Sequence, residues 1–241
     1  MLTGRSRAHV VEVEGPGCTL HRDVVQPFLR LRAAAATAGI DLRAASSFRD
    51  FDRQLFIWNA KFRGERPVLD RQGRAVPMAT LDTAARIEAI LAWSALPGAS
   101  RHHWGTDLDV YDAAAMPDPS RLQLVPEEYA ENGPFARLAE WLAEHLADYG
   151  FFRPYAPRSA AVAAAGVSPE PWHLSFAPLA EKFRAALSPA LLAETLGSAP
   201  LEGREVVIAR LEDIHRRYVM DITPPCARSL GFELGDHRRM V

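Results

Sequence analysis

The sequence predicts an α+β fold, in which a small antiparallel sheet is surrounded by helices and followed by a helical C-terminal extension. Two observations lead to this class. Apolar residues recur at helical spacing in several long segments, whereas only short runs have the character of strands. The chain of 241 residues is 48% hydrophobic, so it can bury one good core with a small appendage.

The predicted helices of the first half begin at capping residues and end at stop signals. Asp23 is an N-cap candidate, and Gly39 ends the apolar run that follows it. Asp82 or Thr83 caps a later helix, which Pro97 and Gly98 terminate. The predicted helices are 23–39, 50–62 and 82–95, and the predicted strands are 42–48, 106–111, 151–155 and 172–176.

The sequence of the second half predicts further helices and a division of the chain into two parts. A helix is expected over 134–149, where Gly150 stops it. From Pro178 onward two or three helices are expected, of which 204–218 is the clearest. We therefore expect a catalytic domain over 1–187 and a helical extension over 188–241. The apolar residues of 204–218 must pack on something, either the catalytic domain or a second subunit.

Composition excludes several classes of partner. The net charge of −2, from 28 basic and 30 acidic residues, provides no bulk attraction to nucleic acid or an anionic membrane. No apolar run of about 18 residues could span a bilayer, and the N-terminus lacks the apolar core of a signal peptide. We expect a cytoplasmic protein, or a periplasmic one if a leader was removed. Cys18 and Cys226 lack metal-site spacing, and a single long-range disulfide between them stays open.

The first motif with chemical meaning is SRHHWGTDLD, over residues 100–109. A catalytic zinc ion needs three protein ligands and one open position, and two histidines with one carboxylate are a common set. His102 and Asp109 are candidates for two of them. Asp107 and Asp109 face the same way in a strand, because side chains alternate. Asp107 is therefore either a rival ligand or an acceptor that orients a ligand histidine.

The second motif, EPWH over residues 170–173, supplies the third ligand and a base. His173 is the candidate ligand, and Glu170 can accept a proton from a water at the open position. In a regular strand the two side chains would face opposite ways. Pro171 favours the first residue of a strand, so Glu170 stays in the preceding loop and can turn toward the metal. Each residue alone is more often an ordinary loop residue, and the combination of two motifs is what favours a metal site.

A third segment, SFRDFDRQ over residues 47–54, lies at a junction from strand to helix. Arg49 could hold a substrate carboxylate in a bidentate pair, or stabilise an oxyanion. On spacing alone, a structural ion pair between Arg49 and Asp50 or Asp52 is nearly as good an interpretation.

Together the three segments resemble a known family. The pattern from Ser100 through His102, Gly105 and Asp109, with EPWH, is similar to the S-x-H-x-x-G-x-A-x-D and E-x-x-H signatures of VanY-type D-alanyl-D-alanine carboxypeptidases. These are zinc peptidases of the peptidase M15 family. The segment with Arg49 and Gln54 resembles that family's S-G-Y-R-S…Q segment. The resemblance extends over roughly residues 22–180, with the motifs in the family's order.

The resemblance implies a role for each matching residue. Zinc would be held by His102, Asp109 and His173, with Glu170 as the catalytic base. Arg49 would bind the substrate near its terminal carboxylate or the developing oxyanion, and Ser100 and Gln54 would help to position it. Asp107 stands where the family has a small apolar residue, so it could tune the charge of the metal or shape the substrate pocket.

The implied substrate is a peptidoglycan-derived peptide that ends in D-alanine. The expected cytoplasmic setting favours recycling of muropeptides, and hence L,D cleavage of a tetrapeptide over D,D cleavage of a pentapeptide. A D,D-dipeptidase or a cell-wall endopeptidase built on the same zinc site is the alternative within the enzyme class. A non-catalytic zinc module that binds wall peptides is the alternative outside it. The oligomeric state is left open.

Overall fold

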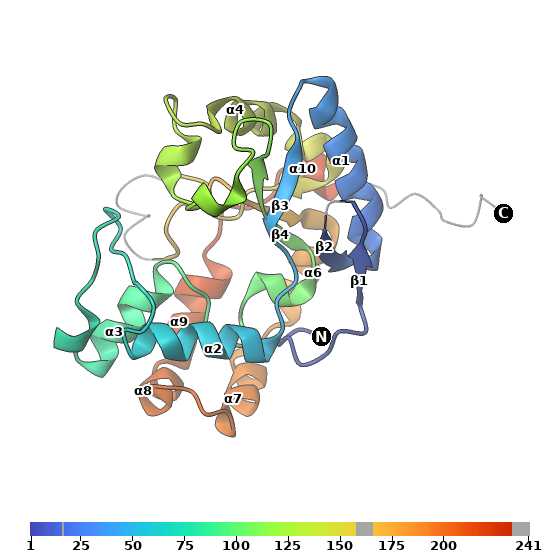
Figure 1. Cartoon of the computed structure of the whole chain (residues 1–241). Coiled ribbons are helices and arrows are strands. Elements are labelled where there is room, and N and C mark those ends of the chain that lie inside the picture. Colours follow the sequence, from blue (N-terminus) through green and yellow to red (C-terminus); the bar gives the residue numbers. More distant parts are fainter. Residues whose placement is uncertain (16, 158–165, 233–241) are drawn as a thin grey trace.

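The computed structural model describes residues 1–15, 17–157 and 166–232, and a four-stranded antiparallel sheet lies at the centre of this part (Figure 1). The strands follow the order β3-β4-β6-β5. Helices surround this sheet, so the predicted α+β class is confirmed. The strands are β3 (Leu42–Ser46), β4 (Asp107–Asp112), β5 (Phe151–Phe152) and β6 (His173–Phe176).

The pairing of β4 with β6 sets the position of the site. Every residue of β4 is buried, as expected for an inner strand with neighbours on both sides. The antiparallel register places Asp109 opposite His173. On the other side of β4, Asp109 is opposite Ser46, after a bulge in β3. Residues of three distant segments therefore meet where β3, β4 and β6 lie side by side.

A hairpin that the sequence did not predict packs against the turn that leads into β4. It consists of β1 (Val10–Val13) and β2 (Cys18–His21). The His21 backbone N–H donates to the Gly105 carbonyl at 2.8 Å. Gly105 has φ +67°, and a Cβ there would lie 2.6 Å from the His21 nitrogen. Only glycine fits, because both the backbone conformation and the close approach exclude a side chain.

The helices of the first half have mostly the expected boundaries. Asp50 and Asp82 cap α2 and α3, each accepting a backbone N–H three residues on. The predicted cap at Asp23 is wrong, because Asp23 lies inside a 3₁₀ turn that the His21 side chain caps. The helices and 3₁₀ turns up to residue 149 are η1 (Arg22–Val24), α1 (Val25–Thr37), α2 (Phe51–Phe62), η2 (Met78–Thr80), α3 (Thr83–Leu91), η3 (Arg101–Trp104), η4 (Pro119–Arg121), η5 (Pro126–Tyr129), α4 (Ala136–His145) and η6 (Leu146–Tyr149).

The C-terminal part divides into more helices than the sequence suggested. The helix predicted over 204–218 is broken at Arg210, whose backbone (φ −111°, ψ 11°) departs from helical geometry. None of the described helices is long and apolar enough to cross a membrane. The elements are α6 (Ala177–Ala186), α7 (Pro189–Gly197), α8 (Arg204–Ala209), α9 (Leu211–His215), the π-helix η7 (Arg216–Met220) and α10 (Ala227–Leu230).

The helices after residue 188 pack on α2 and α3 of the same chain, which answers the question of what the apolar residues of 204–218 pack against. One of the two core clusters joins residues of α2 and α3 with residues of α7, α8 and α9 (Figure 1). Trp58 and Ile87, both fully buried, contribute from the first half, and Leu192 and Val207 from the second. The other cluster lies between the sheet, α1 and α4. The last residues of the predicted extension, 233–241, lie outside the described residues.

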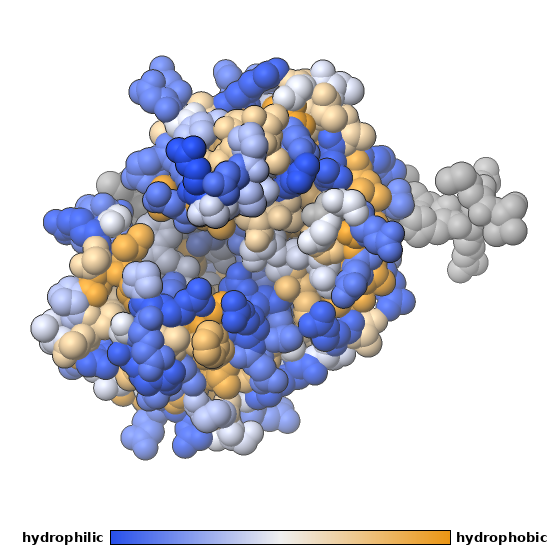
Figure 2. Space-filling model, viewed as in Figure 1, coloured by the Kyte–Doolittle hydropathy of each residue, from blue (hydrophilic) through white to orange (hydrophobic). Residues whose placement is uncertain are grey.

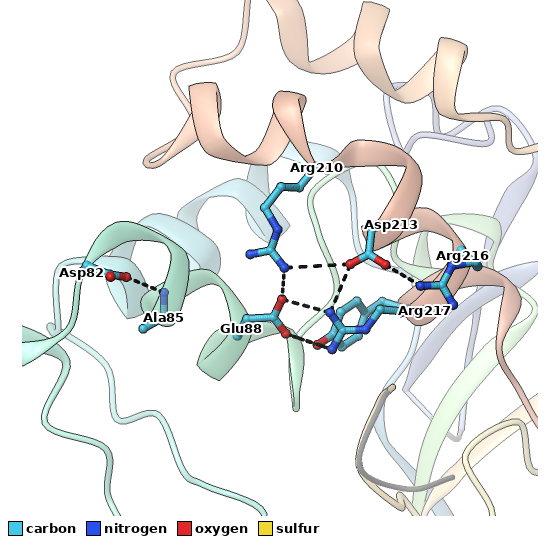
Figure 3. A network of polar contacts seen from close by, with 8 residues as sticks. Asp82, Ala85, Glu88, Arg210, Asp213, Arg216 and Arg217 are labelled. Atoms are coloured by element: carbon cyan, nitrogen blue, oxygen red, sulfur yellow. Dashed lines mark hydrogen bonds and ion pairs between the residues drawn. The ribbon is translucent and has the colours of Figure 1, made fainter.

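A polar network ties the extension to α3 (Figure 3). The Glu88 carboxylate accepts hydrogen bonds from Arg210, from Arg217 at 3.0 Å and from the Tyr218 hydroxyl at 2.6 Å. Asp213 lies in the same network and pairs with Arg217 at 3.2 Å. Burial raises the pKa of Glu88, but the hydrogen bonds from Arg217, Tyr218 and Arg210 outweigh burial and the net pKa is lowered. Glu88 therefore stabilises the fold as a carboxylate.

We expect Glu88→Gln to reduce the free energy of unfolding by about 1–3 kcal/mol at pH 7, because hydrogen bonds to a charged group are weakened. Urea unfolding followed by circular dichroism measures this. The contribution is present above the unfolded-state pKa of about 4.3 and is lost as the pH falls and Glu88 is protonated. The difference between wild type and variant should therefore shrink at acidic pH. Glu144→Gln, at an exposed pair with His145, is the control and should change stability by less than about 0.5 kcal/mol.

Candidate metal centre and active site

Three buried side chains converge on one point: His102 from η3, Asp109 from β4 and His173 from β6. One potential ligand atom from each lies within 4.8 Å of the other two. His102 Nε2 is 3.3 Å from Asp109 Oδ2, and His173 Nδ1 is 3.2 Å from Asp109 Oδ1. These are the three ligands expected from the sequence, and the fold brings them together from positions up to 71 residues apart in the chain.

The second nitrogen of each histidine is already occupied. His102 Nδ1 lies 2.9 Å from the Ser47 carbonyl oxygen, and His173 Nε2 lies 3.0 Å from Asp107 Oδ1. Both partners can only accept, so the outer nitrogens carry the protons. The inner nitrogens, which lie next to Asp109, are then the ones that can offer a lone pair to a metal ion. This is the arrangement that orients histidine ligands in metal sites.

Asp107 belongs behind the metal site and not in the substrate pocket. Its carboxylate is fully buried and accepts from Arg101 Nε at 2.8 Å and from Thr106 Oγ1 at 2.6 Å, besides His173. Burial raises the pKa of Asp107, but Arg101 and His173 outweigh burial and hold it well below its usual range. The position of Asp107 agrees with the prediction that it orients a ligand histidine. It does not agree with the prediction that Asp107 contacts the substrate.

The residues fit a divalent cation. Asp109 Oδ1 is buried and has no hydrogen-bond partner in the described part of the chain. Burial lowers the pKa of His173, but the neighbouring carboxylates of Asp107, Asp109 and Glu170 outweigh burial and raise the pKa well above its usual value. The site thus attracts positive charge, which a proton or a metal ion can supply. Two imidazole nitrogens and one carboxylate oxygen form the donor set of a catalytic zinc site.

Glu170 lies next to this cluster, in the loop that precedes β6. Its Oε2 atom is 3.2 Å from His173 Nδ1. The backbone holds it there, because its N–H donates to the Tyr155 carbonyl at 2.9 Å and its carbonyl accepts from the His173 N–H at 3.1 Å. Strand β6 begins only at His173, after a turn at Pro171, so Glu170 lies outside the strand as expected.

The cluster opens into a cavity of about 320 Å³. Figure 2 shows this face hollowed between the part of the molecule that carries α4 and the part that carries α2 and α3. Residues that the sequence placed in the site and that line this cavity are Arg49, Ser100, His102, Asp109, Glu170 and His173. Gln54 and Asp107, by contrast, are fully buried and do not line it.

Arg49 reaches the cavity because Gln54 holds it. One guanidinium nitrogen donates to Gln54 Oε1 at 2.7 Å and the other to Ser46 Oγ at 3.2 Å. Gln54 Nε2 in turn donates to the Ala95 carbonyl at 2.7 Å. Gln54 therefore positions Arg49, and the expected direct role of Gln54 at the substrate does not fit its location.

The structural alternative for Arg49 does not hold, because the two aspartates have other partners. Asp50 pairs with Arg7 and Asp52 pairs with Arg5, each at 3.3 Å.

Several cavity residues escaped the sequence analysis. Trp93 and Trp172 stack with ring centroids 6.4 Å apart and line one wall, although Trp93 reads as a core residue from helical spacing. Another wall is the 123–125 segment, where the Glu128 carboxylate accepts three successive backbone N–H groups and Leu124 has φ +54°. Lys61 also lines the cavity. No local pattern indicates these positions, because each depends on contacts between distant segments.

The fold and the site are those of a metallopeptidase. Residues 17–179 match the family model of VanY D-alanyl-D-alanine carboxypeptidases. Since this match covers more than half of the chain, the chain belongs to the VanY family, and the resemblance noted from the motifs is confirmed.

Curated relatives exist but do not specify a substrate. An uncharacterized protein of Haemophilus influenzae is 48% identical over 99 residues, which are 40% of this chain and 68% of that protein. A second uncharacterized protein of Haemophilus influenzae is 37% identical over 125 residues, or 52% of this chain and 93% of that protein.

Solved structures share the fold. VanYB in complex with D-alanine-D-alanine has a TM-score of 0.52 at 22% identity, over 80% of this chain and 91% of that chain. A VanY mutant in complex with Zn(II) has a TM-score of 0.50 at 21% identity, over 74% of this chain and 85% of that one. The LD-carboxypeptidase LdcB has a TM-score of 0.50 at 18% identity, over 75% of each chain.

We expect Asp107→Asn to lower the affinity for a divalent metal ion by about 10–100-fold, because a neutral amide oxygen is a weaker acceptor for His173 than a carboxylate and makes the imidazole a poorer ligand. Competition with a chromophoric chelator measures the affinity. Thr106→Val, which removes one hydrogen bond to Asp107 but keeps the charge, should have a smaller effect in the same direction. Asp118→Asn, on an exposed turn, is the matched control. Unchanged metal affinity in a folded Asp107→Asn variant would contradict the orienting role.

Proposed function

We propose that this protein is a zinc-dependent carboxypeptidase that removes the C-terminal D-alanine from peptidoglycan-derived peptides. The observation that carries the proposal is the buried cluster of His102, Asp109 and His173, with Glu170 beside it at the base of a cavity. Membership of the VanY family supports it. So do a VanY structure that contains Zn(II) and a VanYB structure that contains D-alanine-D-alanine.

Zinc held by His102, Asp109 and His173 would supply a Lewis acid and lower the pKa of a coordinated water to about 7. Glu170 is the base in this proposal. Its carboxylate accepts a proton from the attacking water as the oxygen bonds to the carbonyl carbon of the scissile amide. Glu170 then returns that proton to the amide nitrogen, the carbon–nitrogen bond breaks, and free D-alanine leaves as an amine.

Arg49 stabilises the negative charge that develops on the carbonyl oxygen. It lines the same cavity as Asp109 and Glu170, beside the proposed reacting centre. Gln54 and Ser46 hold it in place before substrate arrives. Pre-positioned donors of this kind contribute about 3–4 kcal/mol to transition-state stabilisation. Ser100 lines the same cavity and contacts the substrate beside Arg49 in this proposal.

Glu170→Gln should reduce kcat by about 10²–10⁴-fold while the protein keeps its zinc, since the amide cannot accept the proton. Peptide hydrolysis followed by release of D-alanine gives kcat, and atomic absorption gives the zinc content. Glu140→Gln, at an exposed position on α4, is the matched control and should leave both unchanged. Full activity in Glu170→Gln would overturn the catalytic proposal and favour a non-catalytic module that binds wall peptides.

Mass spectrometry of muropeptides incubated with zinc-loaded protein identifies the bond that is cleaved. We expect loss of one D-alanine from a peptide with a free C-terminus. Loss from a tetrapeptide indicates L,D cleavage, and loss from a pentapeptide indicates D,D cleavage. The preference for L,D cleavage rests on the expected recycling role and stays a prediction. Release of internal fragments from cross-linked peptides would instead indicate an endopeptidase.

A further inference from the structure

The cavity contains a second cation, Lys61, that the chemistry above does not use. Lys61 lies in the last turn of α2, is half-buried and lines the cavity with Arg49. It is one of only two lysines in the chain, and the other, Lys182, is exposed on α6.

Adjacent residues of the chain hold the two cations. Lys61 Nζ donates to Ser94 Oγ at 2.6 Å. The next residue, Ala95, accepts from Gln54, which in turn holds Arg49 at 2.7 Å. Lys61 and Arg49 are thus anchored to two consecutive residues and present their charges on one wall of the cavity.

The positive charge of Lys61 has no matching carboxylate in the described part of the chain. Its ammonium group pairs with no aspartate or glutamate within ion-pair distance, and its one hydrogen-bond acceptor is a neutral hydroxyl. Burial lowers the pKa of Lys61 to about 8, with repulsion from Arg66 and Arg49 adding to this and Glu170 opposing it. A half-buried ammonium with unused donors and cationic neighbours is a binding site for an anion.

We propose that Lys61 binds the C-terminal carboxylate of the substrate, and that this contact makes the protein a carboxypeptidase. The inference rests on the proposed function. Arg49 lines the cavity with Asp109 and Glu170, and its backbone N–H donates to the carbonyl of the ligand residue His102 at 3.2 Å, so we assign Arg49 to the scissile carbonyl. In a peptide that loses its last residue, only three bonds separate that carbonyl carbon from the terminal carboxylate carbon. Two neighbouring cations on one wall match two neighbouring sites of negative charge on the substrate.

The test compares a peptide with a free C-terminus and the same peptide with a C-terminal amide. Wild type should prefer the acid by about 10–100-fold in kcat/KM, as expected for a charged hydrogen-bonded pair. Lys61→Met should lose this preference through a higher KM for the acid, with little change on the amide. Lys61→Arg should keep part of the preference, and Lys182→Met should keep all of it.

The pH dependence gives an independent readout. Lys61 is charged below its pKa of about 8 and neutral above it, so the preference of wild type for the acid should fall as the pH rises through about 8. Lys61→Arg should retain its preference over this range, because arginine stays charged. The tyrosines that line the cavity do not titrate here, since burial raises the pKa of Tyr155 to about 12 and also raises that of Tyr218.

Binding to the Glu170→Gln variant separates this inference from the proposed function. Calorimetry should show tighter binding of the acid than of the amide, and Lys61→Met in that background should abolish the difference. If Lys61→Met lowers kcat/KM equally for both peptides, or leaves the acid preference intact, the assignment of Lys61 is overturned. If wild type cleaves neither peptide, the proposed function fails, and the calorimetric comparison still decides whether Lys61 binds the carboxylate.

Discussion

The antiparallel pairing of β4 with β6 is the constraint on which the rest of the site depends. This register places Asp109 opposite His173 and leaves Asp107, two residues along the same face, to accept from the far side of the imidazole. A shift of one residue would turn both aspartates to the opposite face of the sheet. The backbone hydrogen bonds between β4 and β6 thus fix the distances between Asp107, Asp109 and His173, which flexible side chains alone could not hold.

Charge organises the site around this pairing. Three carboxylates surround the single imidazole of His173, in a place where an unbalanced charge would be costly. Positive charge lies on the cavity wall that carries Arg49 and Lys61. Neither of these side chains forms an ion pair with a described carboxylate. The cavity therefore separates a region with the donor set for a cation from a cationic wall, which is the arrangement that the proposed binding of a substrate carboxylate requires.

The C-terminal extension also supports the cavity. Its helices complete the core beneath α2 and α3, the helices that carry Gln54 and Lys61 or lead into Ser94 and Ala95. Tyr218, which belongs to the network around Glu88, also lines the cavity. The extension thus supports the helices behind the cationic wall and contributes Tyr218 to the lining of the cavity, although its residues lie beyond the part of the chain that matches the family model.

The sequence by itself determined the fold class, the presence of α2, the start of α3 at its Asp82 cap, and the three residues that converge on the metal site. Caps and turn glycines act over a few residues, and the motifs are short, so each is visible in a local stretch of sequence. Tertiary structure alone decided the hairpin that packs on Gly105, the break at Arg210, the placement of Asp107 and Gln54 behind the cavity, and the position of Lys61 within it. These depend on contacts between segments far apart in the chain, which exist only once the sheet has paired and the two cores have packed.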